Sequence, residues 1–408
     1  MEGAFRMDIY EPARTTPCLG EYDVIVCGGG IAGISASLAS ARAGAKTLLI
    51  EREYLLGGLA TAGLVTLYLP LCDGFGRQVS FGLAEELLRL SVRRGCDTAS
   101  QPSASWLRSG RAHGDERFSV QFNPHIFAID AEQLLLDSGV TLLFGSSVCG
   151  VRTENGRITH IIVENKSGRG AYAANTIVDS TGDADIVRLS GEKTALFGQG
   201  NILAGWYYQL RGGEYELRIV GACDAPDGDE TLEHPRPLID RRFSGLDAAE
   251  LTEQAILGRR AALNDFLSFG ALTPSHAMAT LPSIPQIRMT RRLDGISCMD
   301  DSDMHISFDD SVGLFSDWRK RGPVYELRFS AMHGSVVNNL ICSGRNLSNT
   351  DAMWDITRVI PVCAVSGEAA GAAAALFGDF AAADIPSLQR RLRSNGVLLH
   401  EDDASVRP

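Results

Sequence analysis

The sequence lacks closely spaced cysteines, although it contains nine cysteines among 408 residues. No two of them form a C-x-x-C pair, a spacing typical of iron–sulfur and structural zinc ligands. Their odd number and wide spacing indicate reduced thiols. We therefore expect no metal site, and we expect a cytoplasmic protein.

The sequence also lacks a basic run and a long apolar run. It has 38 Lys and Arg against 50 Asp and Glu, a net charge of -12, so we expect no nucleic-acid partner. Residues 1–20 contain no apolar signal-peptide core. Residues 359–377 are short for a membrane span and carry Glu368, Gly367 and Gly371. They are interpreted as a buried helix whose glycines pack closely on a sheet, and no membrane partner is expected.

The most informative pattern lies in residues 22–51. An apolar run at residues 23–27 predicts a buried strand. It leads directly into Gly28-Gly29-Gly30-Ile31-Ala32-Gly33, which fits G-x-G-x-x-G. A helix of small residues follows and ends at Gly44, and a second strand at residues 47–50 ends before Glu51.

Each part of this pattern has a role in binding an adenine dinucleotide. Gly28 permits the tight turn, Gly30 lets a pyrophosphate approach the backbone, and Gly33 lets helix and strand pack closely. The helix N-terminus, with Ile31 and Ala32, offers free N–H groups to the phosphates.

An acidic residue completes the pattern. Glu51 lies 18 residues after Gly33, where a carboxylate accepts hydrogen bonds from ribose hydroxyls, and the adjacent Arg52 is placed in the same site. A glycine-rich turn in an unrelated α/β protein is the alternative.

A β-meander is predicted further along the chain. Strands at residues 148–153 and 158–164 flank the hairpin turn Asn155-Gly156, and a third strand leads through residues 176–179 into Ser180-Thr181-Gly182-Asp183. The chain has 408 residues, 45% of them hydrophobic, so it can bury a large core and is long enough for two domains.

Four stretches together resemble the FAD-dependent oxidoreductase family, with its glutathione-reductase-like flavoprotein fold. The resemblance covers roughly residues 21–190 and 280–378. The stretches are the Gly28–Gly33 turn with Glu51, the Gly57-Gly58-Leu59-Ala60-Thr61 turn, residues 179–183, and the C-terminal block of residues 339–345, 358–363 and 367–373.

The resemblance implies an α/β fold: a three-layer FAD/NAD(P)-binding Rossmann-type domain with a β-meander, plus an inserted, smaller α+β substrate domain. The expected parts are an extended lead-in (1–20), the first part of the FAD-binding domain (21–194), a substrate or cap domain (195–325), the second part of the FAD-binding domain (326–378) and a polar C-terminal tail (379–408).

The resemblance also implies which residues contact FAD. Val148 resembles the position whose backbone contacts the adenine, and Thr181 and Gly182 resemble the turn over the adenosine. The remaining implied contacts surround the flavin ring, and a helix N-terminus aimed at the ring would stabilise its anionic reduced form. They are Gly58, Leu59, Ala60, Thr61, Gly344, Arg345, Pro361 and Val362.

Three side chains are candidates for catalysis. Arg291 and Arg328 have the permanent charge and planar fork that suit a carboxylate or developing negative charge. His333 is a proton-transfer candidate because its ordinary pKa lies near neutrality. The alternatives are structural ion pairs for the arginines and a core or loop position for His333. Residues 206–208 either line a substrate site or pack in a sheet.

The sequence therefore predicts an FAD-dependent oxidoreductase that transfers a hydride between a small organic substrate and non-covalently bound FAD. A flavin monooxygenase, a flavoprotein without net redox (an isomerase or hydratase) and an electron-transfer flavoprotein subunit are the alternatives. Assembly into a homo-oligomer stays open.

Overall fold

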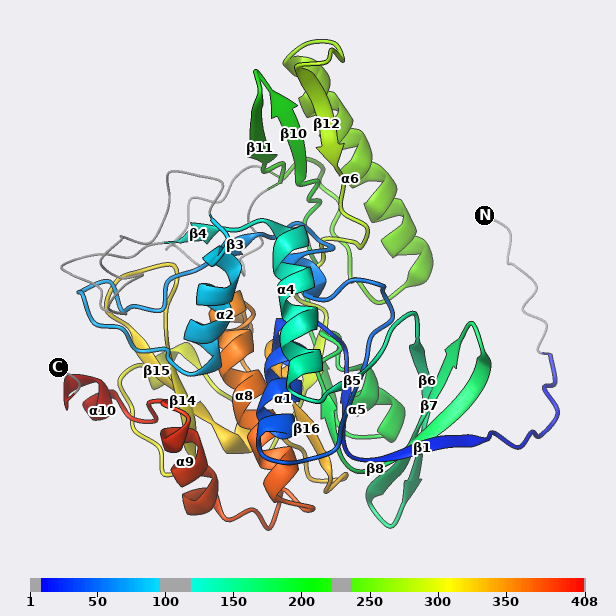
Figure 1. Ribbon diagram of the computed structural model, residues 1–408, viewed down its shortest axis with the longest axis vertical. Coiled ribbons are helices and arrows are strands. Elements are labelled where there is room, and N and C mark those ends of the chain that lie inside the picture. Colours follow the sequence, from blue (N-terminus) through cyan, green and yellow to red (C-terminus); the bar gives the residue numbers. More distant parts are fainter. Residues whose placement is uncertain (1–8, 96–118, 222–236, 407–408) are drawn as a thin grey trace.

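A seven-stranded sheet forms the centre of the protein (Figure 1). The computed structural model describes residues 9–95, 119–221 and 237–406. The strand order is β5-β2-β1-β8-β7-β6, and β16 pairs with β8. The strands are β1 (Cys18–Cys27), β2 (Thr47–Ile50), β5 (Thr141–Leu143), β6 (Ser147–Glu154), β7 (Arg157–Asn165), β8 (Gly168–Asp179) and β16 (Leu340–Cys342).

Alternate residues of the central strands point into two different cores. Val24 and Val26 of β1 pack into the core that contains the main helices, whereas Ile25 and Cys27 pack against the meander. This alternation follows from the period of two along a strand. Where β1, β2, β8 and β16 pair in parallel at residues 24–27, 47–50, 177–178 and 340–342, all residues are buried and nearly all are apolar. The predicted three-layer α/β fold is confirmed.

One layer consists of helices that cover a single face of the sheet (Figure 1). Its helices α1 (Ile31–Arg42) and α8 (Ile360–Leu376) pack so closely that a Cβ on Gly367 would lie 2.3 Å from the Ala32 carbonyl oxygen. A Cβ on Gly371 would lie 2.1 Å from the Ala36 carbonyl oxygen. The buried helix is confirmed, but its glycines allow a close approach to α1 rather than to the sheet.

The other layer is the meander. β6 and β7 are joined through Asn155 and Gly156, whose φ angles of 49° and 73° are those of a two-residue hairpin turn. The first half of β8 pairs with β7, and its second half pairs with β16. This long strand thereby carries the chain from the meander to the carboxyl edge of the parallel sheet, where the turn at residues 180–183 follows.

A smaller unit projects from the sheet at the top of Figure 1. Strands β10 (Tyr207–Arg211), β11 (Glu214–Arg218) and β12 (His276–Thr280) form an antiparallel sheet, and Phe266 of α6 (Ala248–Ser268) packs beside Tyr207. Tyr207 is therefore a core residue.

The predicted boundary between residues 325 and 326 runs through a strand. β14 (Ser311–Ser316) and β15 (Val324–Arg328) pair with each other, and Phe315 and Leu327 belong to the same core as α8. These strands therefore pack with the central layers and not with the projecting unit.

The C-terminal segment, predicted to be a polar tail, contains two helices, α9 (Ile385–Ser394) and α10 (Glu401–Val406). Leu388, Leu392 and Leu399 are buried in the main core, so this prediction is wrong for those positions. Residues 407–408 of this segment, residues 1–8 of the lead-in and residues 222–236 of the cap lie outside the described residues.

The remaining α-helices and strands are α2 (Leu83–Val92), α4 (Pro124–Asp137), α5 (Asp185–Ser190), α7 (Asp351–Thr357), β3 (Leu67–Tyr68), β4 (Val120–Gln121), β9 (Thr194–Leu196) and β13 (Arg291–Leu293).

Within the described ranges, no single helix has the length and hydropathy needed to cross a membrane. The pair α7 and α8, which is bent by 90°, meets those limits only when both helices are taken together.

Candidate functional site

A long groove lies at the carboxyl edge of the parallel sheet. The chain turns there after β1, β2, β8 and β16, and carboxyl ends of parallel strands are where open α/β sheets bind ligands. The groove encloses about 1060 Å³ including its open mouth. It is lined by residues 28, 30–32, 51–53, 57–60, 180–183, 245, 251, 284, 285, 287, 343–345, 358, 360 and 363.

Three positions of the first turn are occupied by glycine, each for a different structural reason. Gly28 has a φ of +102°, and an added Cβ would lie 2.4 Å from the Ser180 carbonyl oxygen. A Cβ on Gly33 would lie 1.8 Å from the Gly28 carbonyl oxygen. A Cβ on Gly30 would meet no atom of the described residues within 4 Å, and Gly30 itself lines the groove. Only a ligand that approaches the backbone gives Gly30 a reason to lack a side chain.

A second glycine turn lies against the first. The Gly57 N–H donates to the Gly29 carbonyl oxygen at 2.8 Å, and a Cβ on Gly58 would lie 3.2 Å from the Cα of Gly30. Leu59 and Ala60 then line the groove. Thr61 does not line it; its hydroxyl donates to the Leu56 carbonyl oxygen and closes the turn.

Glu51 supports the first turn. Its carboxylate accepts from the Gly29 N–H at 2.5 Å and from the Glu53 N–H at 2.8 Å, and burial raises its pKa. Beside it, a hollow of about 570 Å³ is lined by Arg52 and Val148 among other residues. The predicted adenine-side residues therefore lie together at one end of the groove.

Asp179 holds the turn that follows β8. It is fully buried and accepts from the Thr181 N–H at 3.0 Å and the Thr181 hydroxyl at 2.7 Å. Its other oxygen accepts from Ile186 and Val187 at the start of α5, at 2.9 and 3.1 Å. Burial raises the pKa of Asp179 to about 6. This carboxylate fixes the direction in which Thr181 and Gly182 enter the groove.

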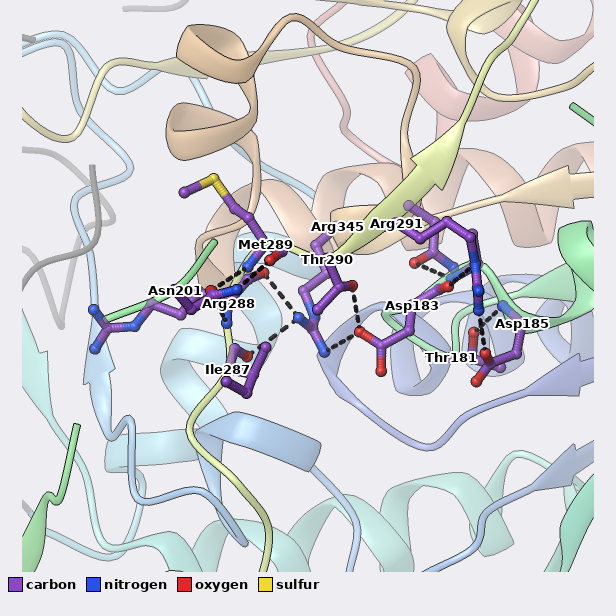
Figure 2. A network of polar contacts seen from close by, with 12 residues as sticks. Thr181, Asp183, Asp185, Asn201, Ile287, Arg288, Met289, Thr290, Arg291 and Arg345 are labelled. Carbon is purple, nitrogen blue, oxygen red and sulfur yellow. Dashed lines mark hydrogen bonds and ion pairs between the residues drawn. The ribbon is translucent and has the colours of Figure 1, made fainter. Parts of the chain in front are cut away.

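Arg345 joins the two sides of the groove (Figure 2). Its guanidinium forms an ion pair with Asp183 at 3.0 Å and donates to the carbonyl oxygens of Arg288 at 2.8 Å and Ile287 at 3.2 Å. The Asn201 side chain accepts from the Arg288 N–H at 3.0 Å from the opposite side. Residues 287–288 are thus held rigidly over the groove.

Two helix N-termini face the groove. Ile31 and Ala32 of α1 line one part, and Ile360 and Cys363 of α8 line another. Anions are stabilised at such positions by free N–H groups and by the helix dipole. Cys363 is not a ready nucleophile, because burial raises the pKa of its thiol to about 12.

A second, largely apolar hollow of about 980 Å³ opens beside the groove. The hollow is lined by Trp206 and Ile219, which directly flank β10 and β11 of the projecting unit, and by Arg288, which lies between β12 and β13. The hollow therefore lies between the two units. Five residues line both the hollow and the groove: Leu59, Ala60, Arg345, Arg358 and Ile360.

Arg358 is fixed by a buried network. Its Nε donates to Asp355 at 2.9 Å, and its Nη2 donates to the same oxygen. Arg319 lies 3.6 Å from Asp355 and 3.0 Å from Asp317, and both carboxylates are fully buried. Each of these buried carboxylates is thus paired with an arginine, which is the condition for burying a charge.

The three predicted catalytic residues are elsewhere. Arg291 pairs with Asp185 at 2.6 Å, and Arg328 pairs with Asp310 at 3.6 Å. His333 is buried, and desolvation lowers its pKa. None of the three is among the residues that line the groove or the hollow. Arg328 and His333 both lie near Asp310, whereas Arg291 pairs with a different carboxylate. Their catalytic roles stay predictions. Each arginine does form an ion pair, which was the structural alternative to catalysis.

Most residues predicted to contact FAD line the groove or its adenine-side hollow. Gly33, Thr61, Pro361 and Val362 do not, because they pack within the turns and the core. The residues that do are Gly28, Gly30, Ile31, Ala32, Glu51, Arg52, Gly58, Leu59, Ala60, Val148, Thr181, Gly182, Gly344 and Arg345.

Sequence reasoning missed Arg358 and Ile360, although both stand in the C-terminal block that carried the resemblance. It also left Ile284, Pro285 and Ile287 out of the site, although they lie in the stretch of residues 280–378 that the resemblance covers. Within the described part of the chain, no cluster of three or more metal-binding side chains occurs.

The family model for FAD dependent oxidoreductases matches residues 23–203 and 208–392. A tRNA uridine 5-carboxymethylaminomethyl modification enzyme, MnmG, of Campylobacter hominis is 31% identical over 173 residues, covering 40% of this chain and 24% of that protein. A thiamine thiazole synthase of Methanococcus vannielii is 25% identical over 189 residues, covering 42% of this chain and 61% of that protein. The chain thus spans about a quarter of the length of the MnmG relative.

Among solved structures, p-nitrophenol 4-monooxygenase PnpA of Pseudomonas putida is 12% identical with a TM-score of 0.47, covering 94% of this chain and 90% of that one. A geranylgeranyl bacteriochlorophyll reductase-like protein of Thermoplasma acidophilum is 15% identical with a TM-score of 0.43, covering 92% and 82%.

The family match extends over nearly the whole described chain, so this protein belongs to the FAD dependent oxidoreductase family. FAD is its cofactor.

Proposed function

We propose that this enzyme transfers a hydride between a small organic substrate and non-covalently bound FAD. The observation that carries the proposal is the shared wall between groove and hollow. The groove has the phosphate-binding turn that FAD requires, and the hollow beside it is enclosed by apolar side chains. A molecule in this hollow would lie against the part of the groove lined by α8.

The residues that line the groove account for binding of the cofactor. The first glycine turn and the N-terminus of α1 would take the pyrophosphate, and the hollow beside Val148 would take the adenosine half. The N-terminus of α8, at Ile360, would lie near the ring end. Bound FAD supplies the redox chemistry as hydride acceptor or donor.

The residues around the hollow would position the substrate and exclude water. Leu59 and Ala60 come from the second glycine turn, and Trp206 and Ile219 come from the projecting unit. The two units therefore close on the substrate from opposite sides. A dry apolar site prevents proton leakage and side reactions during transfer.

The first experiment is the visible spectrum of the purified protein before and after acid precipitation. Release of yellow FAD into the supernatant is expected, because none of the described residues that line the groove carries an activated nucleophile that could bond to the flavin, and burial raises the pKa of the Cys363 thiol. Colour that stays in the pellet would contradict the non-covalent part of the proposal.

The second experiment is anaerobic mixing with candidate substrates. Hydride transfer from substrate predicts bleaching of the flavin band without oxygen or another protein. Product formation with an unchanged flavin spectrum throughout turnover would favour an isomerase or hydratase. Reduction that requires a protein partner would favour an electron-transfer subunit.

A further inference from the structure

The hollow beside the groove has an unusual side-chain chemistry. Apart from apolar groups, the described residues that line it contribute only hydrogen-bond donors, from arginine and tryptophan. Neither an acidic side chain nor any other side-chain acceptor is among them. The lining residues are Leu59, Ala60, Val65, Leu67, Leu69, Trp206, Ile219, Arg288, Trp318, Arg345, Arg358, Val359 and Ile360.

The two tryptophans use their donors within the protein. The Trp206 indole N–H donates to the Gly221 carbonyl oxygen at 3.3 Å, and the Trp318 indole N–H donates to the Asp355 carbonyl oxygen at 3.0 Å. Their rings thus serve the hollow as apolar walls. The Arg358 guanidinium lies 6.0 Å from the Trp318 ring centroid. Among the lining side chains, the arginines are therefore the ones that can donate hydrogen bonds to a ligand.

Two of these arginines differ in how much of the guanidinium is engaged. Arg345 is paired with Asp183 and also donates to two carbonyl oxygens, which holds the backbone over the groove. Asp355 engages Nε and Nη2 of Arg358 and leaves Nη1 outside this pair. Arg358 also lines both the groove and the hollow. It is therefore well placed to contact a molecule held against the cofactor.

Asp355 determines where the Arg358 fork points. Its side chain is fully buried, and Arg319 on its other side is itself 2% exposed. This packed network prevents the long Arg358 side chain from swinging away, so little entropy is lost when it binds a ligand.

We infer that the substrate is an apolar organic anion that carries a carboxylate, and that Arg358 binds this carboxylate while Asp355 acts as a positioning residue. The inference rests on the proposed function, because it assigns the hollow to the substrate. A carboxylate has only acceptors and matches the donor-only lining. A guanidinium forms charge-assisted hydrogen bonds with it, which are about twice as strong as neutral ones.

The test uses the holoprotein with three ligands of one shape: 2-naphthoate, 2-naphthamide and 2-naphthylmethylammonium. Binding is followed by tryptophan fluorescence and by the flavin absorbance band. We expect 2-naphthoate to bind about tenfold or more tightly than the amide, and the ammonium most weakly. Equal affinity of the acid and the amide, or no binding of any probe, would overturn the inference.

Variants assign the effect to residues. Arg358→Met should abolish the preference for naphthoate, and Arg358→Lys should retain part of it because charge remains without the fork. Asp355→Asn should weaken naphthoate binding while leaving naphthamide affinity unchanged, which a general loss of structure would not do. Arg42→Met removes an ion pair with Glu86 at the far end of α1 and is the matched control. Should Asp355→Asn not fold, the two Arg358 variants still decide the matter.

The two proposals fail in different ways. If the flavin is never reduced by any small molecule but naphthoate still quenches tryptophan fluorescence preferentially, the function fails and the anion site stands. If the flavin is reduced by substrate but the acid and the amide bind alike, the function stands and the inference is overturned.

Discussion

Replacing Gly30 by alanine should separate cofactor binding from folding. The Gly30 backbone has a φ of -68° and a ψ of -178°, which alanine adopts without strain. Among the residues that the structure describes, no atom would lie within 4 Å of the added Cβ. The stability of the apoprotein should therefore change by no more than about 1 kcal/mol, with a slight gain from the less flexible unfolded chain.

The same methyl group would stand in the path of the FAD pyrophosphate. Forcing a methyl group into a packed contact costs about 1–3 kcal/mol. Affinity for FAD should thus fall roughly 5–140-fold, since about 1.4 kcal/mol corresponds to a factor of ten. The assay is titration of the apoprotein with FAD, followed by quenching of flavin fluorescence, alongside urea unfolding without FAD.

Gly28→Ala is the matched comparison. It requires alanine at a φ of +102° and puts a Cβ 2.4 Å from the Ser180 carbonyl oxygen. The apoprotein should lose about 2–5 kcal/mol from backbone strain and overpacking together. Unchanged FAD affinity in Gly30→Ala would refute the assignment of this groove to the pyrophosphate. A large loss of apoprotein stability in Gly30→Ala would show that the protein has no room for a Cβ at this position.

Three further changes test the description of the core and the site. Burial raises the pKa of Glu368 to about 7, so the folded state binds this proton more tightly than the unfolded state does. The wild type should therefore lose about 3 kcal/mol of stability, relative to Glu368→Gln, as the pH rises from about 4.5 to 8. Urea unfolding of both proteins across this pH range measures the difference. Gly371→Val should cost about 2–4 kcal/mol in the same assay because its Cβ would collide with the α1 backbone, whereas Gly378→Ala should not. Arg291→Met should lower stability by about 1–3 kcal/mol while turnover per folded molecule is retained, because Arg291 pairs with Asp185 outside the groove and the hollow.

Each of these has a clear contrary result. Parallel pH profiles for the wild type and Glu368→Gln would mean that Glu368 is not desolvated. A stable Gly371→Val protein would contradict the close approach of α1 and α8. Loss of turnover in Arg291→Met at unchanged stability would instead support the catalytic role predicted from the sequence.

The strongest sequence predictions came from local rules. The turn at residues 28–33 follows from backbone geometry, because a strand that turns at once into a helix needs glycine where φ is positive or where two backbones touch. The meander follows from alternating strands around Asn155-Gly156, a pair with its own turn type. Such patterns are set by neighbours in the chain and can therefore be read from the chain.

Glu368 shows where local rules are insufficient. Its place in an apolar helix suggests an acid that interacts with its own helix dipole, but its carboxylate accepts from the Leu83 N–H at 2.6 Å and caps α2 instead. That partner lies 285 residues away along the sequence. The apolar content of residues 379–408 was likewise underestimated, because a few leucines in a polar segment have no meaning until the core they fill is known.

The sequence by itself determined the family, the cofactor turn and the order of the main elements, since each depends on short stretches whose spacing carries the information. The tertiary structure alone decided which charged side chains face the site. Arg291, Arg328 and Arg358 are chemically identical and each pairs with a carboxylate, but only the packing of distant segments places Arg358, and not the other two, in the lining of the groove and the hollow. A charge acts through its distance to other groups, and those distances do not exist until the chain has folded.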